Sequence, residues 1–186
     1  MNQLLSLSRA IDALNTWVGR AAAWLVLAAV VISAGNAISR KLFSLSSNAW
    51  LELQWYLFGA VFMLGAAWTL KLNEHVRIDI LSSRLSKRAR DRLDIVGHLT
   101  LLFPFVLLHI NTAAPFFLGS YRSGEVSTNA GGLIIWPAKL MVLIGFVLLL
   151  LQGVSELIKR IAILRGVIPD DAVPASHAPP SATPTP

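Results

Sequence analysis

The chain contains no cysteine, and charged residues make up only 14% of its 186 residues. Without cysteine, disulfides, thiolate-ligated zinc or iron–sulfur sites and a thiol nucleophile are excluded. Soluble domains usually carry about 25% charged residues, so the scarcity of charge argues against an ordinary water-soluble domain. In place of charge the chain has 55% hydrophobic residues and a mean hydropathy of +0.62. This composition predicts a membrane protein.

Apolar residues gather in four long blocks, which predict spans at about residues 20–40, 50–70, 95–119 and 137–158. Each block is close to the ~20 residues that cross a bilayer as a helix, and none alternates with period two as a barrel strand does. We therefore expect an all-α integral membrane fold with a four-helix transmembrane domain over residues 19–160. A cleaved signal peptide is the alternative for the first block. The long segment before it and the length of the block favour an uncleaved span.

Three further segments lie outside the expected spans. Residues 1–18 place apolar side chains at spacings of three and four, which predicts an amphipathic helix along the membrane or a partner. Residues 78–94 repeat this pattern with basic residues around it, which favours an interfacial helix on anionic lipid or, alternatively, a docking surface for another subunit. Residues 161–186 are rich in proline and alanine, and we expect a disordered tail.

The basic residues predict the orientation. With both termini in the cytoplasm, twelve of the sixteen Lys and Arg residues fall on the cytoplasmic side and four on the other. This bias follows the positive-inside rule, and it accounts for the net charge of +6 without nucleic acid.

Polar residues in or beside the second block are the first candidates for a structural or assembly role. Glu52 and Gln54 interrupt the apolar run near its start. Glu52 is placed either to favour the helix N-terminus or to form a buried pair with another helix or subunit. After the block come Glu74, His75, Arg77 and Asp79, whose spacing lacks a zinc-binding pattern. We expect them to turn the chain at the cytoplasmic end of the span.

The segment before the fourth block is polar and rich in glycine. It is either a structured turn or a contact surface for an extracytoplasmic protein. The residues we single out there are Glu125, Ser127, Asn129, Gly131 and Gly132. Further candidates are His98 and His109, which lie eleven residues apart and so share a helix face. Such a pair is structural or, alternatively, a proton relay.

Several motifs resemble the small membrane subunit of tripartite ATP-independent periplasmic (TRAP) transporters. They are residues 52–58 (ELQWYLF), 64–67 (LGAA) and 73–79 (NEHVRID), of which 75–79 is the most specific. Residues 124–133, with the Trp-Pro-x-Lys motif at 136–139 and the Gly-Phe pair at 145–146, resemble one branch of this family. Ile144 stands where many relatives have a proline shortly before that Gly-Phe pair.

The resemblance, which runs over about residues 10–160, implies a function that composition alone does not. It implies a small, non-catalytic scaffold subunit in the bacterial inner membrane. Its partners would be a large permease subunit and a periplasmic substrate-binding protein, and uptake of organic acids would be driven by sodium. No cofactor or metal is expected in this chain, because the sodium and substrate sites would lie in the large subunit. The alternatives are a membrane-embedded enzyme and a stand-alone membrane assembly factor.

Overall fold

The structure is a computed structural model that describes residues 1–45, 47–73 and 87–169. Its helices are α1 (Asn2–Phe43), α2 (Asn48–Leu72), α4 (Lys87–Gly97), α5 (Phe103–Ser123) and α6 (Trp136–Leu164), with η1 (His98–Leu102), one turn of π-helix, between α4 and α5. The part of the chain that is described contains no strand, only an isolated bridge between Val126 and Ile134. Four stretches are long and apolar enough to cross a membrane: Asn2–Phe43, Asn48–Leu72, Asp91–Ser123 and Trp136–Leu164. The predicted all-α membrane fold is confirmed.

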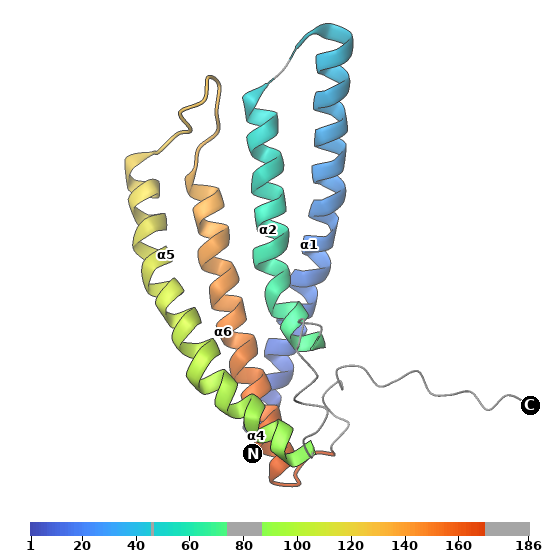
Figure 1. Ribbon diagram of the computed structural model, residues 1–186, viewed down its shortest axis with the longest axis vertical. Coiled ribbons are helices and arrows are strands. Elements are labelled where there is room, and N and C mark those ends of the chain that lie inside the picture. Colours follow the sequence, from blue (N-terminus) through green and yellow to red (C-terminus); the bar gives the residue numbers. More distant parts are fainter. Residues whose placement is uncertain (46, 74–86, 170–186) are drawn as a thin grey trace, which may run out of the picture.

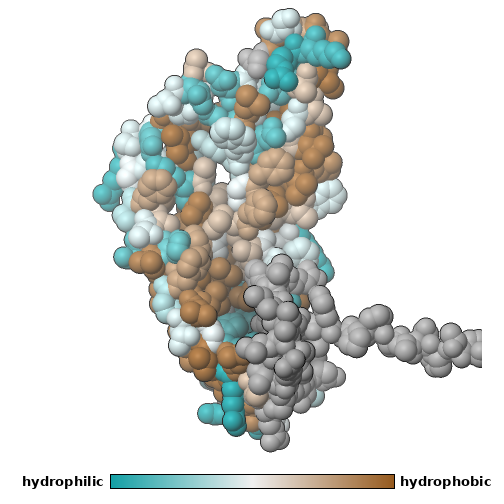
Figure 2. Space-filling view, in the orientation of Figure 1, coloured by the Kyte–Doolittle hydropathy of each residue, from teal (hydrophilic) through white to brown (hydrophobic). Residues whose placement is uncertain are grey.

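The helices stand side by side in the order α5, α6, α2, α1 (Figure 1). Each packs on its neighbour in this row, and α1 also crosses onto α6 near the end where α1 begins. We call this the tail end, because α2 and α6 finish there. The opposite end, which carries the α5–α6 loop of residues 124–135, is the loop end. Exposed apolar side chains cover much of the outer surface between the two ends, as lipid contact requires (Figure 2).

Helix α1 is longer than a membrane span needs. Its 42 residues extend about 63 Å at 1.5 Å per residue, roughly twice the thickness of a ~30 Å hydrocarbon core. The expected amphipathic segment 1–18 and the expected first span are one unbroken helix, because residues 1–43 contain no proline. Leu4, Leu7 and Leu14 are exposed, whereas Ser8 and Asn15 face inward.

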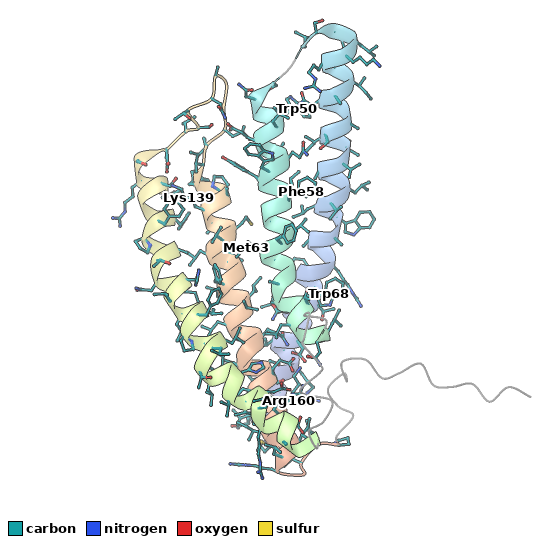
Figure 3. The ribbon with its side chains drawn as sticks, viewed as in Figure 1. Trp50, Phe58, Met63, Trp68, Lys139 and Arg160 are labelled. Carbon is teal, nitrogen blue, oxygen red and sulfur yellow. The ribbon has the colours of Figure 1, made fainter. Side chains whose placement is uncertain are left out.

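Small residues allow the helices in the middle of the row to approach closely. A Cβ at Gly145 of α6 would lie 2.8 Å from the backbone oxygen of Met63 on α2. A Cβ at Gly19 of α1 would lie 2.7 Å from the Trp68 side chain (Figure 3). Membrane helices associate through such close packing, because lipid is as apolar as their side chains.

The third span is a composite of three elements. The chain continues from α4 through η1 into α5 without leaving the helical conformation. Within η1 the helix widens, so that the N–H of Phe103 reaches five residues back to the carbonyl of His98. The predicted interfacial segment 78–94 lies outside the described residues up to residue 86, as does the tail from residue 170 onward.

Candidate functional site: polar ties at the two ends of the bundle

A cluster of polar side chains joins α1 to α6 at the tail end. We call it the tail-end cluster, and it consists of Ser8, Asp12, Asn15, Gln152, Ser155, Glu156 and Lys159. The α6 members are spaced three and four residues apart, which places them in one stripe along the helix. The α1 members have the same spacing. The two helices therefore meet through polar stripes rather than apolar ones.

Lys159 holds the two carboxylates of the cluster. Its ammonium donates to Asp12 Oδ2 at 3.0 Å and to Glu156 Oε1 at 2.5 Å. The exposed fractions of the three side chains are 11%, 18% and 6% for Lys159, Asp12 and Glu156. Burial makes each charge costly unless it is paired, so the two acids and the ammonium depend on one another.

Gln152 connects the remaining members, and it is fully buried. Its amide nitrogen donates to Asp12 and to Glu156, at 2.9 Å each, and its oxygen accepts from the amide of Asn15 at 2.8 Å. Ser155 donates to Asp12 at 2.7 Å. This uses the single hydroxyl proton of Ser155, so Ser8, 2.7 Å away, donates to Ser155 in turn.

Two basic residues tie further helices to this end. Lys71 at the end of α2 donates to the hydroxyl of Thr16 at 2.5 Å and to the backbone oxygen of Asp12 at 3.3 Å. Arg160 of α6 pairs with Asp91 at 2.6 Å and with Asp94 at 3.1 Å, which fixes α4 against α6 (Figure 3). Helices α1, α2, α4 and α6 are thus all tied together at the tail end.

Glu52 of α2 makes the corresponding contact at the loop end, where it joins α2 to the α5–α6 loop. Only 6% of the surface of Glu52 is exposed. Its carboxylate accepts hydrogen bonds from the Ser127 hydroxyl, from the Asn129 amide at 2.7 Å and from the N–H of Leu133 at 2.7 Å. One expected alternative was a buried pair with another helix or subunit; the partners instead belong to the α5–α6 loop of the same chain. The α5–α6 loop is therefore folded around a carboxylate that α2 supplies.

The two glycines that the sequence singled out make this loop possible. Gly131 has a φ of 71°, a conformation that side-chain-bearing residues rarely adopt. A Cβ at Gly132 would lie 2.5 Å from the Cβ of Ser127. The N–H of Ser127 bonds to the carbonyl of Leu133 at 2.9 Å across the loop. The predicted structured turn is what the structure shows for these residues.

Glu125 and Lys139 form a second contact at the loop end. The Lys139 ammonium donates to Glu125 and also lies 3.9 Å from the centre of the Phe116 ring. The hydrogen bond from Lys139 lowers the pKa of the Glu125 carboxyl below its usual value. This contact joins the loop to the first turn of α6.

Each of the two histidines of the third span contacts a backbone carbonyl four residues earlier in the chain. His98 Nδ1 lies 2.6 Å from the carbonyl of Asp94, and His109 Nδ1 lies 2.7 Å from the carbonyl of Phe105. The His109 ring also stacks between Phe105 and Phe146, with ring centres 4.1 and 4.6 Å away. These contacts are those of structural residues.

The remaining candidates have different outcomes. Gln54 is half-buried on α2. The candidates Glu74, His75, Arg77 and Asp79 lie outside the described residues, so their assembly role stays a prediction. Among the residues that are described, no group of three or more His, Asp or Glu side chains is arranged to hold a metal ion.

The apolar pattern of the sequence did not predict the tail-end cluster. The sequence does contain a signal for it. Within and just after the fourth apolar block, polar residues recur at helical intervals, namely Gln152, Ser155, Glu156 and Lys159. Polar residues with this spacing in an apolar helix indicate a polar contact with another helix.

Comparison with known proteins identifies the family. The family model described as "Tripartite ATP-independent periplasmic transporters, DctQ component" matches residues 29–162, which is most of the chain. No curated protein and no solved structure matches the chain. The matched range covers the Glu52 contacts, the α5–α6 loop and the α6 half of the tail-end cluster. A membrane protein with four spans and this match belongs to the DctQ family, the small subunits of TRAP transporters.

Proposed function

We propose that this chain is the non-catalytic scaffold subunit of a sodium-driven TRAP transporter that takes up organic acids. Its partners are a large permease subunit, in which the sodium and substrate sites lie, and a periplasmic substrate-binding protein. Family membership supports the tripartite context. The sodium coupling and the organic-acid substrates rest on the family resemblance of the sequence.

The internal pairing of the buried charges carries the scaffold role. Glu52, Asp91, Glu156 and Lys159 are buried, and each is bonded to another group of this chain. A transport path instead needs polar groups that face a water-filled cavity and can exchange their partners with the substrate. Ties at both ends of the bundle make it a rigid body, and rigidity is the property that a scaffold needs.

The proposed orientation places the tail end in the cytoplasm and the loop end in the periplasm, in agreement with the distribution of Lys and Arg. The α5–α6 loop then faces the binding protein. Because Glu52 fixes its conformation, this loop would offer a preformed docking surface, in which Glu125, Ser127, Asn129, Gly131 and Gly132 either contact the binding protein or shape the contact.

Two experiments test the proposal. The first measures uptake of radiolabelled mono- and dicarboxylates in cells that lack either membrane subunit, with and without a sodium gradient. Loss of uptake in both deletions, and with sodium removed, is expected. Full sodium-driven uptake by the large subunit alone would refute the scaffold role.

The second experiment tests the orientation with reporter fusions at residues 45, 85, 127 and 175. Periplasmic signals are expected at 45 and 127 and cytoplasmic signals at 85 and 175. A cytoplasmic signal at 127 would contradict the docking role of the loop.

A further inference from the structure

The outward side of the third span carries polar groups in a place where lipid would be expected. We call it the α5 outer face, and its residues are Thr100, Pro104, Leu107, Asn111, Pro115 and Leu118. All six are exposed. Their spacings of three, four, seven and eleven residues place them on one side of the helix.

The face contains a repeat of eleven residues. Thr100 precedes Pro104 by four positions, and Asn111 precedes Pro115 by four positions. Proline has no N–H, so Pro115 cannot donate to the carbonyl of Asn111 four residues earlier. Pro104 likewise leaves the η1 turn without one donor. Each half of the repeat therefore combines a polar side chain with a proline that gives its helix no backbone donor. The Thr100 hydroxyl donates to the carbonyl of Val96 in its own helix, at 2.7 Å.

Asn111 lies deep in the span. It is four residues from the middle of Asp91–Ser123, or about 6 Å along the axis at 1.5 Å per residue. Its side chain is exposed, and no hydrogen bond links its amide to another described residue. The hydroxyl of Thr112 beside it is also exposed but donates to the carbonyls of Leu108 and His109 in its own helix. Of these two side chains, the Asn111 amide is therefore the one without a hydrogen-bond partner among the described residues.

The chain itself does not cover this face. Helix α5 stands at the end of the row and packs on α6 with its opposite side, through residues such as Val106, His109 and Ala113 (Figure 1). Along the edge of the surface that α5 forms, hydrophilic and neutral side chains interrupt the hydrophobic ones (Figure 2). Acyl chains cannot form hydrogen bonds, so the exposed Asn111 amide at this depth requires a protein partner.

We infer that the α5 outer face binds a transmembrane helix of the large permease subunit, which forms hydrogen bonds with the Asn111 side chain and with the backbone carbonyl that Pro115 leaves without a donor. This inference rests on the proposed function for the identity of the partner. The family match supplies the occupant, because a DctQ component works within a tripartite transporter that has a second membrane component. A second copy of this chain could pair through its own Asn111 amide, which both donates and accepts, and the experiment below distinguishes the two occupants.

Site-specific photo-cross-linking in cells that contain both membrane subunits tests the inference. A benzophenone amino acid replaces Leu107 or Leu118 on the α5 outer face, or Trp24 on α1 as the control. Both probe positions leave Asn111 in place. Trp24 is 72% exposed and lies at the other end of the row. The expected result is an adduct with the mass of one small and one large subunit from positions 107 and 118, and background yield from position 24.

The other outcomes of this experiment overturn the inference. An adduct of twice the mass of this chain would identify a second copy as the occupant. Equal or greater yield at position 24 would place the permease elsewhere. No adduct at 107 and 118, while the unsubstituted subunits still co-purify, would reject the face and leave the proposed function intact. Failure of the unsubstituted subunits to co-purify would overturn both.

A pair of substitutions isolates the role of the amide. Asn111→Leu removes it and makes the helix more apolar, so membrane insertion is preserved. Recovery of the permease with tagged Asn111→Leu should fall about 3- to 30-fold, and with Thr112→Val less than about 2-fold, as expected for one interhelical hydrogen bond in a membrane. Equal recovery with both variants would contradict the inference.

Discussion

Replacing Lys159 by methionine should destabilise the bundle more than any loss of a surface charge. The substitution keeps the length of the side chain and removes the ammonium that contacts Asp12 at 3.0 Å and Glu156 at 2.5 Å. Two carboxylates then share the amide of Gln152, with no cation of the tail-end cluster between them. The cost arises from the charges left behind rather than from the lost lysine.

The magnitude follows from burial. Removing one partner of a buried ion pair costs about 3–5 kcal/mol. Asp12 keeps 18% of its side chain exposed, and water screens part of its charge, so we take the lower end, about 3 kcal/mol. For a chain of 150–250 residues, 1 kcal/mol lowers Tm by about 2–4 °C, so the expected fall is about 6–12 °C.

Thermal unfolding of the purified chain in detergent, followed by the fluorescence of its six tryptophans, measures this fall. The matched control is Lys41→Met, because Lys41 is exposed in the last turn of α1 at the loop end. A surface substitution of this kind should change stability by less than about 0.5 kcal/mol, which corresponds to less than about 2 °C.

Equal Tm values for Lys159→Met and Lys41→Met would refute the argument that the tail-end cluster is electrostatically coupled. The triple variant Asp12→Asn, Glu156→Gln, Lys159→Met offers a further check. It removes all three charges and keeps most of the shape, so it should recover much of the loss, since a buried ionic cluster contributes little relative to a neutral one. A triple variant less stable than Lys159→Met would contradict the same reasoning.

The other predictions concern the loop end and the cytoplasmic exit of α2. Glu52→Gln should speed hydrogen exchange of the loop amide bonded to this residue about fivefold, because a charged acceptor is replaced by a neutral one; unchanged exchange would count against the tie. Gly132→Ala should destabilise the chain by about 1–3 kcal/mol, seen as a lower Tm, because the new methyl meets a serine side chain. The hydrogen bond from Lys139 lowers the pKa of Glu125, so its stabilisation is present above the ordinary carboxyl pKa and is lost as pH falls through the lowered value. The Tm gap between wild type and Glu125→Gln should therefore persist at pH 7 and close as the pH falls through the lowered pKa of Glu125, below the ordinary carboxyl range. His75→Ala should reduce co-purification with the permease before it alters substrate affinity; normal assembly with lost transport would contradict this.

The expected spans agree closely with the helices, except in α1. Residues 50–70, 95–119 and 137–158 lie within Asn48–Leu72, Asp91–Ser123 and Trp136–Leu164. The sequence predicts a separate amphipathic helix over residues 1–18, because the polar residues of this segment keep it from continuing the apolar block of the first span. A helix continues wherever nothing breaks it, however, and the partners of those polar residues lie on α6, out of reach of a local pattern.

Glu52 illustrates what residue type can and cannot predict. A carboxylate near a span must be paired or placed at a helix end, and both alternatives were visible from sequence. The partners that decide between them are Ser127, Asn129 and Leu133, which lie 75 to 81 positions further along the chain. Their glycine-rich segment predicted a structured turn, but it did not show what the turn encloses.

The sequence by itself determined the fold class and the family, and it predicted where three of the four long apolar helices lie, because the bilayer constrains each segment separately and the family motifs are local. Only the tertiary structure decided which polar groups meet. Ser8 forms a hydrogen bond with Ser155, and Asp12 forms an ion pair with Lys159. The two residues of each pair are 147 positions apart in the sequence. Such pairing depends on the crossing of α1 over α6 and on the close approach that Gly19 and Gly145 permit along the row. The residue type shows that a buried charge must be paired, and the geometry of the packed helices decides which residue pairs with it.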